Sequence, residues 1–237
     1  MYILLDANVT AGYYLKRSIS STKAFDRITN IFNSVRSGGT NHFFYIPNFC
    51  IAEVFNVFMK HAYSRWNNHV KKKGTIDKRI YEKLVHQFET DIHNGKFLYQ
   101  YELSRYHILA INLVAPIHHY FKLTRSPLQM STYDHLIIAM GVHLAHIHGK
   151  ENVVILSSDN RLHDVVDNCK RYIPKMTIQK LKLSIAEKVT GKPFSKNLFP
   201  KCINLKTATK KELLLIFNEW PLPSGKKRFK VSRYLVD

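Results

Sequence analysis

Short apolar runs alternate with helix-length periodic segments along this chain, and that alternation limits its fold more than any other feature. Residues 2–5 and 153–156 are apolar and rich in strand-forming side chains, and a polar residue closes each run, as is typical of buried strands. Residues 43–46 predict another strand, because a turn-forming Ser-Gly-Gly-Thr-Asn segment precedes them. We therefore expect an α/β fold in which helices flank both faces of a small parallel sheet.

The segments between these strands carry the apolar periodicity of helices. We predict helices at residues 21–35, 47–65, 76–92, 103–120 and 133–148. Residues 65–101 are polar and basic, and they add more chain than a compact α/β unit requires. The sequence thus predicts one domain at residues 1–180 with a helical, basic insertion at about 65–101. A basic C-terminal extension or small lobe is expected at residues 181–237.

The charge balance points to a polyanionic partner. The chain has 36 Lys and Arg against 17 Asp and Glu, which gives a net charge of +19. Nucleic acid is the commonest polyanion bound by a basic protein; the alternative is that this charge only keeps the protein soluble. No G-x-x-x-x-G-K-[ST] or G-x-G-x-x-G segment occurs in the sequence, which argues against the usual nucleotide-binding sites.

The cysteines and apolar tracts bear on where the protein works. Cys50, Cys169 and Cys202 are odd in number and far apart, so we expect reduced thiols. The first residues lack the charged region and long apolar stretch of a signal peptide. The longest apolar tract, residues 108–117, is too short to cross a bilayer. We expect a cytoplasmic protein with no membrane-spanning segment.

Four acidic residues, Asp6, Glu53, Asp134 and Asp159, sit in or beside apolar segments of this basic chain. A carboxylate in such surroundings is costly unless it is paired, hydrogen-bonded or bound to a cation. Brought together, the four would form an oxygen-ligand site for Mg²⁺ or Mn²⁺. Asp6 and Asp159 follow predicted strands, where ligands of open α/β sheets bind.

Each acid also has a structural explanation. Asp159 is placed to accept hydrogen bonds as the N-cap of a following helix, and Asp6 is placed to cap a turn. Glu53 fits a partly exposed helical position. Asp134 lies in a first helical turn, where the macrodipole favours an acid regardless of function. One shared cation explains all four more economically than four separate causes.

The acids lie in four ordered segments that resemble the motifs of PIN-domain nucleases. These segments are residues 3–9, 46–56, 133–139 and 154–162. The resemblance covers about residues 1–170, and all four motifs in order are a more specific signal than any one alone. It implies a three-layer α/β/α fold with a small parallel sheet. The insertion and the C-terminal extension depart from the family pattern.

The resemblance also implies a function and a site. The acidic tetrad would be Asp6, Glu53, Asp134 and Asp159, both as catalytic residues and as ligands of Mg²⁺ or Mn²⁺. Asn8 and Ser157 would be polar neighbours of this site. Asn56 is a further candidate neighbour, because it lies one helical turn after Glu53 on the same face. The family hydrolyses phosphodiester bonds, usually in RNA, so the expected activity is that of a metal-dependent endoribonuclease. Candidate partners are single-stranded or structured RNA, an antitoxin-like protein and a second copy of the chain.

Two further expectations concern binding. Basic side chains around the acids would steer the strand inward; the candidates are Lys16, Arg17, Lys122, Arg125, Arg161, Lys226, Lys227 and Arg228. The alternative function is an RNA- or protein-binding module that uses a PIN-like scaffold without cleaving. We expect His143, His146 and His148 to be exposed helical residues rather than zinc ligands, because no carboxylate or Cys lies at ligand spacing.

Overall fold

The computed structural model describes residues 1–15, 23–38, 41–69, 78–125, 130–172, 199–209 and 211–213. The described strands are β1 (Tyr2–Leu5), β2 (Phe43–Pro47), β3 (Leu98–Tyr101), β4 (Val153–Ser157) and β5 (Lys201–Asn204). The described helices are α1 (Ala7–Tyr14), α2 (Lys23–Arg36), α3 (Asn48–His69), α4 (Lys78–His93), α5 (Arg105–Arg125), α6 (Thr132–His148) and α7 (Asn160–Tyr172), with a 3₁₀ turn η1 (Lys150–Asn152) before β4. The three predicted strands and five predicted helices are therefore present, with their ends shifted by a few residues.

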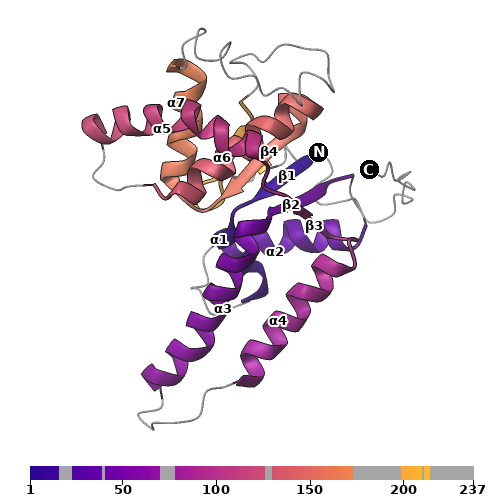
Figure 1. Ribbon diagram of the computed structural model, residues 1–237. Helices are drawn as coiled ribbons and strands as arrows, with labels where there is room; N and C mark the ends of the chain where they lie inside the picture. Colours follow the sequence, from indigo (N-terminus) through magenta and orange to yellow (C-terminus); the bar gives the residue numbers. More distant parts are fainter. Residues whose placement is uncertain are drawn as a thin grey trace.

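The strands form one parallel sheet in the order β3-β2-β1-β4-β5. Helices α1 to α4 lie on one face and α5 to α7 on the other, below and above the sheet in Figure 1. The chain thus has the expected α/β class, with a five-stranded parallel sheet between two helical layers. Such a sheet is buried on both faces, which explains why its central strands read as continuous apolar runs.

Both edge strands of the sheet lie outside the three segments that were predicted as strands. Leu98–Tyr101 pairs with β2, so the end of the predicted insertion at 65–101 belongs to the central sheet. The paired helices α3 and α4 precede it and project from the body of the molecule (Figure 1). Lys201–Asn204 pairs with β4, so the sheet extends past the boundary placed at residue 180. Both strands have four residues and include polar ones, which made their apolar signal weak.

Helix α1 was not predicted, because it lacks a polar face. All its residues except Asn8 are buried, between β4 and the helices α2 and α3. A helix enclosed on nearly all sides shows no amphipathic stripe. It begins directly after Asp6, so the first carboxylate lies at the junction between the sheet and this enclosed helix.

Helix α6 packs very closely on β4, and Gly141 permits this approach. A Cβ atom at this position would lie 2.6 Å from Cδ1 of Ile155 and 3.3 Å from Cγ of Pro200. Residues 136–146 of the helix are buried throughout. The close contact fixes α6, and therefore the carboxylate at its N-terminal end, relative to the sheet.

The cysteines and the helices each bear on an expectation from the sequence. Cys50, Cys169 and Cys202 are all buried, and none forms a disulfide. Among the helices that the structure describes, none has the length and apolar character needed to cross a membrane.

Candidate active site

Two of the four carboxylates lie where the sheet topology places a ligand site. The strand order switches direction between β1 and β4, and ligands of open α/β sheets bind beyond the carboxyl ends of the strands at such a point. Asp6 directly follows β1, and Asp159 follows β4 by two residues. The two side chains therefore start from neighbouring strand ends.

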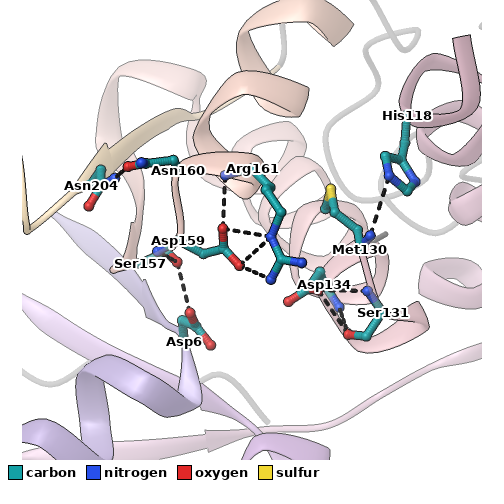
Figure 2. A network of polar contacts seen from close by, with 10 residues as sticks. All are labelled: Asp6, His118, Met130, Ser131, Asp134, Ser157, Asp159, Asn160, Arg161 and Asn204. Atoms are coloured by element: carbon teal, nitrogen blue, oxygen red, sulfur yellow. Dashed lines mark hydrogen bonds and ion pairs between the residues drawn. The ribbon is translucent and has the colours of Figure 1, made fainter. Parts of the chain in front are cut away.

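Ser157 connects Asp6 to the loop that carries Asp159. The Ser157 hydroxyl donates a hydrogen bond to Oδ2 of Asp6 at 2.8 Å, and the Asp159 backbone amide donates to the Ser157 hydroxyl oxygen at 2.9 Å (Figure 2). Ser157 is fully buried, so water does not compete for these bonds. They orient the Asp6 carboxylate and link the ends of β1 and β4.

Burial shifts the pKa of the Asp6 carboxyl group. Its side chain is only 3% exposed, and burial raises the pKa of Asp6 from 3.8 to about 6 against the opposing effect of the Ser157 hydrogen bond. The negative charges of Asp134 and Asp159 raise this pKa further. A carboxylate in such a position is stabilised by a proton or by a bound cation.

Glu53 and Asp134 reach the same region from two helices, α3 and α6. The pKa of the partly exposed Glu53 is raised first by burial and then by the charges of Asp6 and Asp134. Burial likewise raises the pKa of the Cys50 thiol, and the charges of Asp6, Glu53 and Asp134 add to that effect. Carboxylates from β1, α3 and α6 thus share one electrostatic environment.

Asp134 has a structural role as well. Its Oδ2 atom accepts hydrogen bonds from the backbone amide of Ser131 at 2.8 Å and from the Ser131 hydroxyl at 2.9 Å. In return, the Asp134 amide donates to the Ser131 hydroxyl at 3.2 Å. This reciprocal capping box starts α6. The helix-start explanation for this acid therefore applies, and it occupies one oxygen of the carboxylate.

Asp159 is engaged by Arg161. The Arg161 backbone amide donates to Oδ1 of Asp159 at 2.8 Å, as in an N-cap of α7, and the side-chain Nε lies 2.9 Å from each carboxylate oxygen. Burial alone would raise the pKa of Asp159, but these bonds hold it below its ordinary value. Figure 2 shows the guanidinium group between the carboxylates of Asp159 and Asp134. Arg161 is thus a built-in countercharge for the acidic site.

The donor chemistry of the site fits a hard divalent cation, although the side chains do not form a closed cage. Mg²⁺ and Mn²⁺ prefer carboxylate oxygens, and the raised pKa of buried Asp6 marks a place where positive charge is favoured. Within the described ranges, no three His, Cys, Asp or Glu side chains are grouped as a ready set of metal ligands. To bind an ion, the carboxylates of Asp6, Glu53 and Asp134 would have to move closer together. Arg161 would also have to release the carboxylate of Asp159.

The predicted neighbours differ in their contacts. Ser157 bonds to Asp6 as described, and the Asn8 backbone amide also acts to lower the pKa of Asp6, whereas the side chains of Asn8 in α1 and Asn56 in α3 are exposed. Among the predicted basic residues, Arg161 lies at the acids.

The other predicted basic positions belong to α5 or lie outside the described residues. Lys122 and Arg125 belong to the last turn of α5. The remaining predicted basic residues, Lys16, Arg17, Lys226, Lys227 and Arg228, lie outside the described residues.

Asn204 and Lys206 are neighbours of the acidic site that were not predicted from the sequence. Asn204 ends β5, its side-chain amide donates to the side chain of Asn160, and its Oδ1 accepts from the Lys206 amide at 2.9 Å. The positive charge of Lys206 helps to lower the pKa of Asp159. The signal was a polar residue closing a short apolar run, the same pattern that identified Asp6.

The expectation that the α6 histidines are exposed is wrong, because two of them are buried and His148 is half-buried. His143 and His146 are buried, because α6 is enclosed by the sheet and its neighbouring helices. Nδ1 of His143 lies 2.7 Å from the Tyr101 hydroxyl and 3.1 Å from Nε2 of His107. Burial is the main reason why the pKa of His107 falls to about 3 and that of His143 to about 4. These rings are therefore neutral polar core groups near pH 7.

Comparison of the chain with protein-family models gave no match, and comparison with curated proteins gave none either. A functional conclusion therefore depends on the site itself, on the charge of the chain and on the sequence motifs that carry the acids.

Proposed function

We propose that this protein is a metal-dependent endoribonuclease of the PIN-like type. The observation that carries the proposal is the electrostatic coupling of Asp6 with Asp134 and Asp159, and of Glu53 with Asp6 and Asp134, beyond the carboxyl ends of β1 and β4. Structural capping explains Asp134 and Asp159, but it does not explain why buried Asp6 lies among other carboxylates. A cation-binding function explains that arrangement.

Each acid has a distinct place in this proposal. Asp6, Glu53 and Asp134 would hold Mg²⁺ or Mn²⁺, with Asp159 joining them when Arg161 moves away. When bound, such an ion activates water and stabilises negative charge on the leaving oxygen of a phosphodiester. Ser157 keeps Asp6 oriented through the buried hydrogen bond between β1 and β4. Arg161, once released from Asp159, is placed to contact the phosphate.

RNA is the proposed substrate on two grounds. The net charge of +19 favours a polyanion, because each phosphate that Lys or Arg neutralises releases condensed counterions. The ordered acidic motifs resemble a family that acts mostly on RNA. Lys206 and Arg161 supply positive charge beside an otherwise acidic site.

The proposal is tested with the full chain and an unstructured RNA in the presence of Mg²⁺ or Mn²⁺. Internal cleavage that leaves 5′-phosphate ends is expected, and excess EDTA should abolish it. Asp6→Asn should remove cleavage while leaving the circular dichroism spectrum unchanged. Lys150→Gln, at an exposed position in η1 at the opposite end of β4, is the matched control and should cleave normally. Cleavage that persists in EDTA would contradict a metal-dependent mechanism.

A non-cleaving RNA- or protein-binding module is the second candidate, and one observation favours it. Arg161 already compensates Asp159, as expected of a site that does not bind metal. A binder of this kind would retain RNA intact at every Mg²⁺ or Mn²⁺ concentration. Calorimetry with Mn²⁺ would then detect no binding that depends on Asp6, whereas a nuclease must show it.

A further inference from the structure

Two aromatic rings stack on each other at the rim of the acidic site. Phe49 lies in the first turn of α3 and Tyr133 near the start of α6; their ring centroids are 5.3 Å apart and their planes differ by 19°. Phe49 precedes Glu53 by one helical turn, and Tyr133 directly precedes Asp134. The ring pair is therefore attached to two elements that each carry a carboxylate.

Tyr133 is unusually open to solvent for an aromatic residue. Its exposed fraction is 48%, and it is the one aromatic side chain among the large apolar residues that are exposed in the described part of the chain. Phe49 stacks on the ring, and nearly half of the Tyr133 side chain still faces solvent. Water thus contacts an aromatic side chain that a second ring holds in place.

From this arrangement we propose that Tyr133, supported by Phe49, stacks on an unpaired nucleobase next to the scissile phosphate. The inference rests on the proposed function and makes Tyr133 a residue that positions the strand at the cleavage point. A base within a duplex is covered on both faces by its neighbours, whereas a splayed base can stack on a protein ring. Stacking of this kind tolerates any base identity, because every base has an aromatic face.

The surroundings favour a base over a protein partner. The exposed surface consists of one supported ring, whereas a stable protein interface buries roughly 800 Å² on each partner. Asp134 directly follows Tyr133, and Glu53 lies one helical turn after Phe49, so a partner's apolar side chain would meet an acidic neighbourhood. A nucleotide suits both features, since its base is apolar on its faces and its phosphate matches the metal and the arginine of the adjacent site.

The first stage of the test maps where wild-type protein cleaves a fluorescently labelled, mixed-sequence single-stranded RNA in Mn²⁺. The second stage uses the same RNA with one base at a time removed from the riboses that flank the cleaved bond. Dissociation constants, measured in the Asp6→Asn background, and single-turnover rates are then compared for wild type and Tyr133→Ala. This design forms a double-mutant cycle between one side chain and one base.

Tyr133→Ala should weaken binding of the intact RNA by about tenfold, the typical effect of losing one stacked base. On the RNA that lacks the stacking base, the same substitution should have no effect. Because stacking releases no counterions, the loss should be equal at low and high salt. Tyr133→Trp should restore binding, whereas Tyr133→Leu, which is apolar but has no flat ring, should not.

The matched control is Tyr81→Ala. Tyr81 pairs with Tyr63 on the projecting helices α3 and α4, with centroids 6.1 Å apart, and Tyr63 is about 15 Å farther along α3 than Glu53 at 1.5 Å per residue. This control should bind and cleave the intact RNA as wild type does. Thermal unfolding of each variant separates a local effect from a loss of folding.

The outcomes separate the inference from the function on which it rests. If wild type neither binds nor cleaves RNA in either metal, the proposed function fails and the stacking site with it. Suppose that wild type cleaves, but that Tyr133→Ala loses the same affinity for intact and base-deleted RNA, or loses no affinity. The stacking site alone is then refuted. Equal cleavage of a fully paired duplex would also overturn the inference.

Discussion

Arg161 holds both carboxylate oxygens of Asp159, with its Nε atom 2.9 Å from each of them. The pair lies two residues apart at the start of α7, so the local chain fixes it without help from distant elements. It places a positive charge where the proposed cation would bind. The negative charges of Asp134 and Asp6 also act to raise the pKa of Arg161. A guanidinium and a divalent cation therefore compete for the same acids.

This competition predicts that Arg161→Gln binds Mn²⁺ more tightly than wild type. A partly exposed ion pair contributes up to about 1 kcal/mol, so the dissociation constant should fall by up to about fivefold. Isothermal titration calorimetry measures this dissociation constant. The control is Arg105→Gln, because Arg105 packs over Tyr106. Weaker binding by Arg161→Gln would mean that Arg161 orients Asp159 for the metal instead of competing with it.

The raised pKa of Asp6 predicts that Asp6→Asn stabilises the metal-free protein at neutral pH. The folded-state pKa of about 6 exceeds the ordinary value of 3.8, so folding is penalised by the ionised carboxylate above pH 6. The penalty is on the order of 3 kcal/mol at most. As the pH falls from 6 to 3.8, the folded wild type takes up the proton and the penalty disappears.

Urea unfolding at a series of pH values, without metal, measures this difference. Asp6→Asn should be more stable than wild type at pH 7.5, and the two should converge near pH 4. Asn can still accept the Ser157 hydrogen bond, whereas Asp6→Ala would leave that buried hydroxyl unpaired and serves as the contrasting variant. A stability difference that does not change with pH would show that Asp6 is not protonated near pH 6.

Proton uptake by Asp6 also predicts the pH dependence of metal binding. A cation must displace the proton, so the apparent affinity for Mn²⁺ should decrease by about tenfold per pH unit below pH 6 and level off above it. Calorimetry between pH 5 and pH 8 tests this. Asp6→Asn should bind more weakly, with a flatter profile. A flat profile in wild type would exclude Asp6 as a ligand.

The contact of α6 with β4 predicts that Gly141→Ala destabilises the fold. The added methyl group would lie 2.6 Å from Ile155 and 3.3 Å from Pro200, and such overpacking typically costs about 1–3 kcal/mol. The helix propensity of Ala returns about 1 kcal/mol, so a net loss of up to roughly 2 kcal/mol is expected in urea unfolding. Ala52→Gly, at an exposed position of α3, measures the propensity term alone. A stabilised Gly141→Ala would mean that α6 can shift away from the sheet.

The central strands and their acids were predictable because the relevant signals are local. Residues 2–5 and 153–156 are apolar runs, and Asp6 and Asp159 follow them within a few residues. The edge strands β3 and β5 were missed, since a four-residue strand with polar members gains its stability from pairing with a neighbour rather than from its own composition. Helix α1 was missed for a related reason: burial on nearly all sides removed its periodicity.

The details of the site depend on contacts that no single segment specifies. The stacking of Phe49 on Tyr133 requires α3 and α6 to meet, and the Ser157 bond to Asp6 requires β4 to pair with β1. The ion pair between Arg161 and Asp159 is local, but it bears on cation binding only because Asp134 lies nearby. Sequence patterns therefore identified the acids, whereas tertiary packing determines their partners.

The final prediction concerns the basic C-terminal run at residues 226–228, which lies outside the described residues. With a net charge of +19, RNA affinity should fall steeply as salt increases, with a slope of about −0.7 for each phosphate contacted on a single strand. Neutralising residues 226–228 together should flatten that slope by about 2 if all three contact phosphates. Fluorescence anisotropy in the Asp6→Asn background measures the slope without cleavage. The matched control is neutralisation of the Lys run at residues 71–73, which removes the same charge elsewhere in the chain. Equal flattening by both changes would indicate a general field effect, and an unchanged slope after the C-terminal change would place the phosphate contacts at residues 71–73 or beside Arg161 and Lys206.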